Sequence, residues 1–259
     1  MTTTATHKSG CFHKSSIIKE TMSKHNNHKK EGGLQAVILA AGKGTRMLPL
    51  TLNRPKPLQC VLGKSLIAWK LEALPARVDE IIIVIGYQGE QIQAEIGNSY
   101  QGKKIQYVVQ KELNGTAGAL LSAKELLGER FLVMMGDDLY AKEDVAMIAE
   151  CEWGVCVAEV FQKEMGGEMK VNKEGNFFGI REEKHYVERG LVNTGLYMLR
   201  HEILDIEPVL IGVSSREFGL PHTLAVIAQH TPVSLVVATG WMQVTTAEDL
   251  KRAERFVVR

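Results

Sequence analysis

A glycine-rich loop early in the sequence carries cations and backbone groups that suit the binding of phosphate. The loop reads Leu39, Ala40, Ala41, Gly42, Lys43, Gly44, Thr45 and Arg46. Glycine has no Cβ, so backbone amides at Gly42 and Gly44 can approach a phosphate closely, while Lys43 and Arg46 add positive charge. Taken alone, this pattern fits a phosphate site and an ordinary glycine-rich turn equally well.

The two commonest phosphate-binding motifs do not fit the loop. A dinucleotide fingerprint requires G-x-G-x-x-G, and Met47 occupies the position of its third glycine. Gly63-Lys64-Ser65 resembles the end of a Walker A loop, but Leu58 stands where its first glycine is required. The sequence therefore excludes both a Rossmann dinucleotide site and a P-loop.

Two further positions carry charged groups that suit phosphate chemistry. Lys56 lies between Pro55 and Pro57, which restrict its backbone and favour a fixed position for the side chain. Asp137 and Asp138 follow an apolar run of strand length. A carboxylate at the carboxyl end of a buried strand suits Mg²⁺, which prefers oxygen ligands and substrate phosphates. Paired aspartates are also common in plain turns.

Alternating apolar runs and helical patterns predict the elements that position these groups. Strands are predicted over 36–39, 81–85, 105–109 and 131–135, and helices over 66–74, 88–96 and 116–127. Continuous apolar strands of this kind indicate a parallel sheet covered on both faces by right-handed βαβ units. The glycine-rich loop then lies at the carboxyl edge of the sheet, where ligands bind in open α/β folds.

The pattern changes after Asp138. Antiparallel strands are predicted over 155–161, over 169–181 with a turn at 174–176, and over 191–199, followed by a helix over 218–229, a strand over 233–238 and a helix over 247–257. We therefore expect an α/β fold, a Rossmann-like three-layer α/β/α sandwich. Its central sheet is mixed and mainly parallel, and a smaller antiparallel sheet forms the acceptor side of the site.

The bulk composition limits the domain organisation and the partners. Residues 1–33 are polar and rich in lysine and histidine, which predicts a disordered extension before a single domain over 34–259. A net charge of +1 gives no sign of a nucleic-acid or membrane partner. No apolar run approaches the roughly 20 residues that span a bilayer. We expect a cytoplasmic protein with reduced cysteines, and a homo-oligomer stays open.

The stretch from Leu39 to Thr51, followed by Arg54-Pro55-Lys56-Pro57-Leu58, resembles the nucleotidyltransferases of the sugar-1-phosphate nucleotidylyltransferase (NDP-sugar pyrophosphorylase) type. The resemblance covers residues 34–257. It implies that residues 39–46 wrap a triphosphate, and that Arg46, Lys56 and Asp137 are catalytic, with Asp137 a ligand of Mg²⁺. It also implies that Gln110, Gly115 and Thr116 read the base, with a spacing that resembles the uridylyltransferase form.

The same resemblance implies an acceptor site and includes one departure from the family pattern. Glu183 and Lys184 match the family's E-K-P element, with His185 in place of proline, and are implied to bind the sugar phosphate. Asn193 and Thr194 match a V-N-T-G strand implied to reach the sugar. Gln243 stands where the family usually has a metal-binding aspartate, so the predicted metal site loses one negative charge.

The sequence therefore predicts transfer of a nucleoside monophosphate from a nucleoside triphosphate, UTP favoured, to a sugar 1-phosphate. The products are an NDP-sugar and pyrophosphate, with Mg²⁺ as cofactor. Two alternatives stay open. One is a cytidylyltransferase acting on a phosphorylated alcohol, which the sugar-binding elements disfavour. The other is a catalytically weakened nucleotide-binding regulatory module, which Gln243 favours and which Arg46, Lys56 and Asp137 disfavour.

Overall fold

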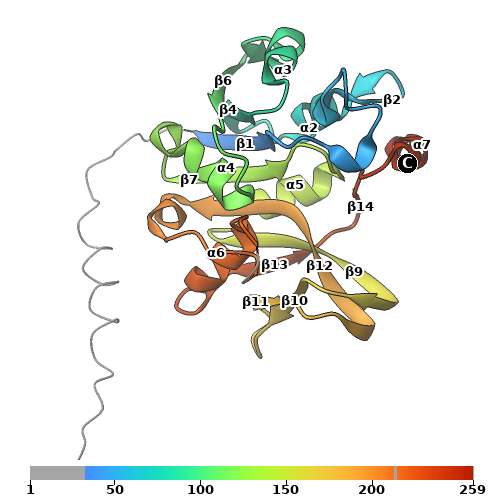
Figure 1. The fold of residues 1–259 in the computed structure, drawn as a ribbon. Coiled ribbons are helices and arrows are strands. Elements are labelled where there is room, and N and C mark those ends of the chain that lie inside the picture. Colours follow the sequence, from blue (N-terminus) through green and yellow to red (C-terminus); the bar gives the residue numbers. More distant parts are fainter. Residues whose placement is uncertain (1–32, 213–214, 259) are drawn as a thin grey trace, which may run out of the picture. The chain divides into compact units, whose positions relative to one another are not determined.

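The computed structural model describes residues 33–212 and 215–258, so the predicted extension over 1–33 lies almost wholly outside the described residues. Within the described part, a mixed sheet lies between two sets of helices (Figure 1). Its parallel core consists, in spatial order, of β7 (Arg130–Met135), β1 (Leu34–Ala40), β4 (Val78–Ile85) and β6 (Lys103–Val109). These four strands coincide with the four apolar runs predicted from the sequence.

Helices cover both faces of the parallel strands. One face carries α4 (Thr116–Ser122) and α6 (Leu220–Ala228), and the other carries α2 (Leu66–Ala73), α3 (Gly89–Ile96) and α5 (Lys142–Ala149). Side chains alternate along β1, so Val37 and Leu39 pack into the first core while Ala36 and Ile38 pack into the second. This arrangement confirms the predicted three-layer sandwich.

The smaller antiparallel part is continuous with the parallel core. Its antiparallel strands are β9 (Gly154–Met165), β10 (Glu168–Val171), β11 (Phe177–Arg181) and β12 (His185–Arg200), and β13 (Ser234–Val237) pairs parallel to β9. The carboxyl-terminal part of β12 pairs antiparallel with β7, while its remainder runs beside β9 away from the parallel strands (Figure 1). The predicted strands over 155–161 and 191–199 are therefore the amino-terminal part of β9 and the carboxyl-terminal part of β12, which are both longer than predicted.

Short elements complete the described fold. They are the strands β2 (Cys60–Val61), β3 (Lys64–Ser65), β5 (Ser99–Tyr100), β8 (Leu139–Tyr140) and β14 (Trp241–Met242), the 3-10 turns η1 (Thr45–Met47), η2 (Lys56–Leu58), η3 (Lys124–Leu126) and η4 (His201–Asp205), and the closing helix α7 (Ala247–Val257). The helix predicted over 116–127 is shorter than expected. It ends at Ser122 because the chain tightens into η3, where Lys124 donates to the carbonyl of Leu204 and to Asp205.

The described residues also bear on membrane-spanning segments and on the state of the cysteines. Within the part of the chain that the structure describes, no helix is long and apolar enough to cross a membrane. Cys60, Cys151 and Cys156 are free thiols. Burial raises the pKa of the Cys156 thiol to about 11, so this side chain is a neutral core residue.

Candidate active site

A cavity of about 570 Å³ opens at the carboxyl ends of β1 and β7. It is lined by Leu39, Ala40, Ala41, Gly42, Lys43, Gly44, Thr45, Arg46, Lys56, Pro57, Gln110, Leu113, Gly115, Thr116, Ala119, Met135, Gly136, Asp137, Ile211, Glu217 and Thr245. All of the residues predicted to be catalytic or to bind the nucleotide are in this set. Four segments that are distant in sequence thus meet at one edge of the sheet, which is the edge where open α/β folds bind ligands.

The glycine-rich loop follows β1 and turns sharply at Gly44. This residue has a positive φ of 63°, and a Cβ added there would lie 2.9 Å from Cβ of Lys56. The loop therefore requires glycine both for its backbone conformation and for its close approach to the lysine segment. Thr51 secures the turn because its hydroxyl donates to the carbonyl of Gly44 at 2.9 Å. The predicted phosphate loop is thus packed directly against Lys56.

Lys56 and Asp137 form an ion pair within the cavity. The Lys56 ammonium lies 2.5 Å from Oδ2 of Asp137, and the two side chains are 7% and 35% exposed. Lys56 begins the short turn η2 between two prolines, which explains why so long a side chain is held in one place. Arg46 is exposed in η1 at the other side of the loop. Two cations and one carboxylate therefore face the same space.

A second lysine lies behind this pair, and sequence reasoning missed it. Lys70 of α2 is fully buried and donates to the carbonyl of Leu66 at 3.0 Å. Burial lowers its pKa to about 8, although the negative charges of Asp137 and Asp138 act in the opposite direction. The available signal was a lone lysine among the apolar residues Leu66, Ile67 and Leu71 of a buried helix.

Asp138 has a different environment from its neighbour Asp137. Its side chain is buried, and Trp241 Nε1 donates to its Oδ2 at 3.1 Å. Burial and the adjacent charge of Asp137 raise its pKa to about 7, against the opposing effect of Lys70. Asp138 does not line the cavity, whereas Asp137 does. Asp137 therefore lines the cavity, whereas the side chain of Asp138 is packed inside the protein.

Gln110 and the start of α4 form the wall predicted to read the base. Gln110 follows β6, is buried, and donates through Nε2 to Asn114 Oδ1 and to the carbonyl of Gly115, both at 3.2 Å. Gly115 has a φ of 100°, and a Cβ there would lie 2.4 Å from the carbonyl oxygen of Phe218. Sequence reasoning also missed Glu217, which lies in the same segment as Phe218 and lines the cavity.

Gln243 is exposed and does not line the cavity, but the local strand pairing brings it near the aspartates. β14 pairs antiparallel with β8, with Met242 opposite Leu139. Continuing this register by one residue sets Gln243 across from Asp138. Asp144 fixes the turn before β14, because its carboxylate accepts hydrogen bonds from the backbone of Thr239 and Gly240. Thr245, two residues beyond Gln243, does line the cavity.

The residues predicted to bind the sugar phosphate lie outside the cavity lining. Glu183 and Lys184 are exposed in the loop between β11 and β12. Asn193 donates to the hydroxyl of Tyr197 at 2.6 Å. Thr194 is fully buried, and its hydroxyl donates to the carbonyl of Cys156 at 2.9 Å, so this side chain faces the core rather than the cavity. The structure thus brings together the residues predicted to bind the nucleotide, but it does not bring the residues predicted to bind the sugar phosphate into the same cavity lining.

The donor set at the cavity fits one magnesium ion bound mainly through substrate. Among the described residues, no cluster of three or more histidine, cysteine, aspartate or glutamate side chains forms a complete protein cage for a metal. Mg²⁺ is commonly held by one or two carboxylates together with substrate phosphates and water. Asp137 offers one carboxylate at the cavity wall, and 35% of its side chain is exposed. One protein carboxylate beside a phosphate loop meets this requirement.

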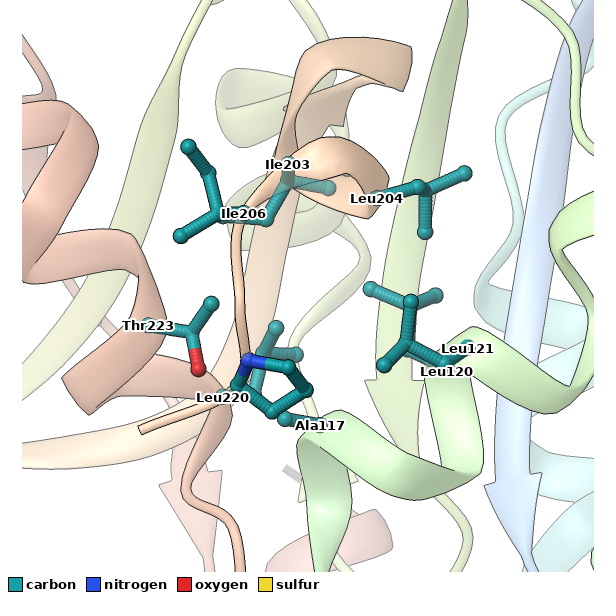
Figure 2. A pocket seen from close by; sticks show the side chains of 9 residues that line it. Ala117, Leu120, Leu121, Ile203, Leu204, Ile206, Leu220 and Thr223 are labelled. Carbon is teal, nitrogen blue, oxygen red and sulfur yellow. The ribbon is translucent and has the colours of Figure 1, made fainter. Parts of the chain in front are cut away.

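A second, smaller cavity lies between α4 and α6. Figure 2 shows Ala117, Leu120, Ile203 and Leu220 among the apolar side chains around it. Its volume is about 10 Å³. Such a space is at the lower limit for a single water molecule, so it is a packing gap and not a substrate site.

Comparisons with known proteins identify the family. The nucleotidyl transferase family model matches residues 35–259. The bifunctional protein GlmU of Methanocaldococcus jannaschii is 32% identical over 173 residues, which are 67% of this chain and 41% of that protein. The UTP–glucose-1-phosphate uridylyltransferase AglF of Haloferax volcanii is 27% identical over 245 residues, which are 86% of this chain and 96% of that protein.

A solved structure shows the same fold. The crystal structure of a UDP-glucose pyrophosphorylase complexed with UDP-glucose superposes with a TM-score of 0.70 at 21% identity, covering 87% of this chain and 98% of that one. The chain spans only 41% to 50% of the GlmU proteins that it matches in Methanocaldococcus jannaschii and Methanococcus maripaludis. Because the family model matches almost all of the described residues, the chain belongs to the nucleotidyl transferase family.

Proposed function

We propose that this chain transfers a nucleoside monophosphate from UTP to a sugar 1-phosphate, forming a UDP-sugar and pyrophosphate. The observation that carries the proposal is the single cavity in which the glycine-rich loop meets Arg46 and the Lys56–Asp137 pair. The relative in Haloferax volcanii is named a UTP–glucose-1-phosphate uridylyltransferase, which supports the same chemistry. The structurally similar pyrophosphorylase was crystallised with UDP-glucose, which supports a nucleotide sugar as product.

The proposed reaction is an in-line displacement at the α-phosphorus of the triphosphate. An oxygen of the sugar 1-phosphate forms the new P–O bond, and the bond to the β-phosphate breaks with its electron pair leaving on pyrophosphate. A sugar phosphate is already ionised near pH 7, so the step requires no general base and no covalent intermediate. The protein's task is to hold two anions together and to stabilise the charge that develops between them.

The cavity residues have distinct roles in this proposal. Backbone amides at Gly42 and Gly44 cradle the triphosphate, and Arg46 contacts it from the exposed side of the loop. Lys56 is held against Asp137, so its charge is positioned before substrate binds. Asp137 would hold Mg²⁺, with Gln243, which follows β14, as the second candidate ligand. When bound, the metal would act as a Lewis acid on the phosphate oxygens.

The orientation of Gln110 supports the preference for UTP. Its Nε2 must face the carbonyl of Gly115, because a carbonyl only accepts hydrogen bonds and the opposite amide orientation would bring two acceptors together. The side-chain oxygen is thereby left as an acceptor at the cavity wall. Uracil presents an N3–H donor on its pairing edge, whereas cytosine presents an acceptor at the same position. An acceptor at Gln110 thus favours uracil over cytosine.

A pyrophosphate-release assay with each nucleoside triphosphate against a panel of sugar 1-phosphates tests the proposal. We expect the fastest release with UTP and one of the sugar 1-phosphates. Release of pyrophosphate only with CTP and a phosphorylated alcohol would refute the proposed function and support the cytidylyltransferase alternative. Tight nucleotide binding with no release across the whole panel would show a regulatory module instead.

A further inference from the structure

The loop predicted to bind the sugar phosphate is fixed to the protein at both ends. This loop, residues 182–184, joins β11 to β12. Glu183 and Lys184 are exposed, with 86% of the Glu183 side chain accessible. Exposed side chains on a free loop would lose much conformational entropy on binding a ligand. The contacts made by the rest of the loop therefore decide how well these two groups are presented.

His185 fixes the carboxyl-terminal end of the loop to β10. Its Nδ1 lies 2.9 Å from the carbonyl oxygen of Glu183, and its Nε2 lies 2.9 Å from Oε2 of Glu168. Both partners are acceptors, so the imidazole satisfies both contacts when each ring nitrogen carries a proton. The ring and the Glu168 carboxylate are nearly buried, and Lys170 holds the same carboxylate from the other side. The backbone of Glu183 is thereby tied to a strand.

His222 fixes the amino-terminal end of the loop to α6. Its Nε2 lies 2.8 Å from Oε1 of Glu182, and its side chain is 14% exposed. The fold makes room for this ring, because a Cβ at Gly219 would lie only 2.2 Å from Nδ1 of His222. Glu217, two residues before Gly219, lines the nucleotide cavity. The contact therefore connects the loop to the segment that leads into the cavity wall.

The turn between β9 and β10 also supports the amino-terminal end of the loop. A Cβ at Gly166 would lie 2.6 Å from the carbonyl oxygen of Glu182, so the two backbones approach closely at this point. The loop is thus held by a turn, by a strand and by a helix. The side chains of Glu183 and Lys184 are exposed, and so is that of Glu182, which pairs with His222. The Glu183 carboxylate also lies 3.9 Å from Nε of Arg181, at the end of β11. A fixed backbone that presents exposed polar side chains is the arrangement expected of a preorganised binding loop.

We propose that His185 and His222 are positioning residues for the sugar 1-phosphate: they hold residues 182–184 so that Glu183 and Lys184 meet the acceptor in one geometry. The inference rests on the proposed function, because it assigns the loop to the acceptor of that reaction. Neither histidine touches the substrate. His185 acts through the backbone of Glu183 and through Glu168, and His222 acts through Glu182.

Two measurements on His185→Ala and His222→Ala test the proposal. In pyrophosphate-release kinetics, we expect KM for the sugar 1-phosphate to rise about tenfold in each variant, with KM for UTP unchanged within twofold. In hydrogen exchange of the free protein, we expect faster exchange of the amides of residues 182–185. His230→Ala is the matched control, because His230 is an exposed histidine at the end of α6 that should alter neither measurement.

The two readouts separate the possible failures. Equal increases in KM for both substrates, or faster loop exchange with no change in KM for the sugar phosphate, would overturn the positioning role. Unchanged hydrogen exchange of residues 182–185 would show that the two histidines do not fix the loop. If wild-type protein releases no pyrophosphate with any acceptor, the proposed function fails. The hydrogen-exchange data would still show whether His185 and His222 fix the loop. His185→Gln, which retains one donor, replaces His185→Ala if that variant does not fold.

A double variant tests whether His185 acts through Glu168. If it does, adding Glu168→Ala to His185→Ala raises KM for the sugar 1-phosphate little further, because both changes release the same attachment. Full additivity of the two single effects would show that His185 acts independently of β10.

Discussion

Replacement of Asp137 by alanine separates catalysis from stability at the candidate site. The change removes the proposed metal ligand and leaves Lys56, whose side chain is 7% exposed, without its partner. Loss of one electrostatic contact made in the transition state typically costs 100-fold or more in turnover, which is about 2.7 kcal/mol or more. We therefore expect pyrophosphate release at saturating substrates to fall at least about 100-fold.

The stability cost follows from the different burial of the two partners. Breaking a fully buried pair costs about 3–5 kcal/mol, and an exposed pair contributes about 0.2–1 kcal/mol. Lys56 is buried but Asp137 is 35% exposed, so an intermediate loss of about 2 kcal/mol is expected. In a domain of this size, that corresponds to a fall in Tm of roughly 4–8 °C. The variant stays folded at 25 °C, so unfolding does not explain the loss of turnover.

A double variant sharpens this prediction. Adding Lys56→Met removes the unpaired buried cation, so thermal denaturation should recover most of the lost Tm while turnover stays low. Glu143→Ala, which removes an exposed carboxylate of α5, is the control and should change neither quantity. Near-normal turnover in Asp137→Ala would remove the metal assignment. A Tm that does not recover in the double variant would show that the Lys56 charge is not the source of the instability.

Three further predictions concern neighbouring groups. Gln243→Asp should tighten the apparent affinity for Mg²⁺ in a titration of activity, and an unchanged titration would remove Gln243 from the metal site. Gln110→Ala should reduce the preference for UTP over CTP in kcat/KM by about tenfold, the scale of one lost hydrogen-bond contact; an unchanged ratio would refute its role. The pKa of Asp138 is raised from 3.8 to about 7, so the folded state keeps a proton that the unfolded state loses. The free energy of unfolding should therefore fall as pH rises from about 4 to 7, and this slope should flatten in Asp138→Asn when measured by urea denaturation.

Local sequence patterns were sufficient to predict the parallel core and the sheet edge at which the glycine-rich loop and Asp137 meet. Continuous apolar runs specify strands buried on both faces, and β1, β4, β6 and β7 follow these runs closely. The glycine-rich loop and Asp137 directly follow two of these strands, so their meeting at one sheet edge follows from parallel pairing alone. Their distance from each other in sequence, nearly a hundred residues, did not matter, because chain direction and sheet order decide which strand ends are adjacent.

Contacts between segments that are distant in sequence could be identified only from the tertiary structure. Nothing local to Lys70 indicates the aspartates that face it, and the helix pattern around it is that of an ordinary core helix. The hydroxyl of Thr194 is buried against Cys156, although its motif alone implied a sugar contact. Residue type and spacing specify which groups are available, whereas burial and partner choice arise only when strands, helices and loops pack. For this protein the sequence alone therefore predicted the parallel core and the position of the glycine-rich loop at its edge. Only the fold decided which charges are paired, which are buried, and that His185 and His222 contact the residues that flank Glu183 and Lys184.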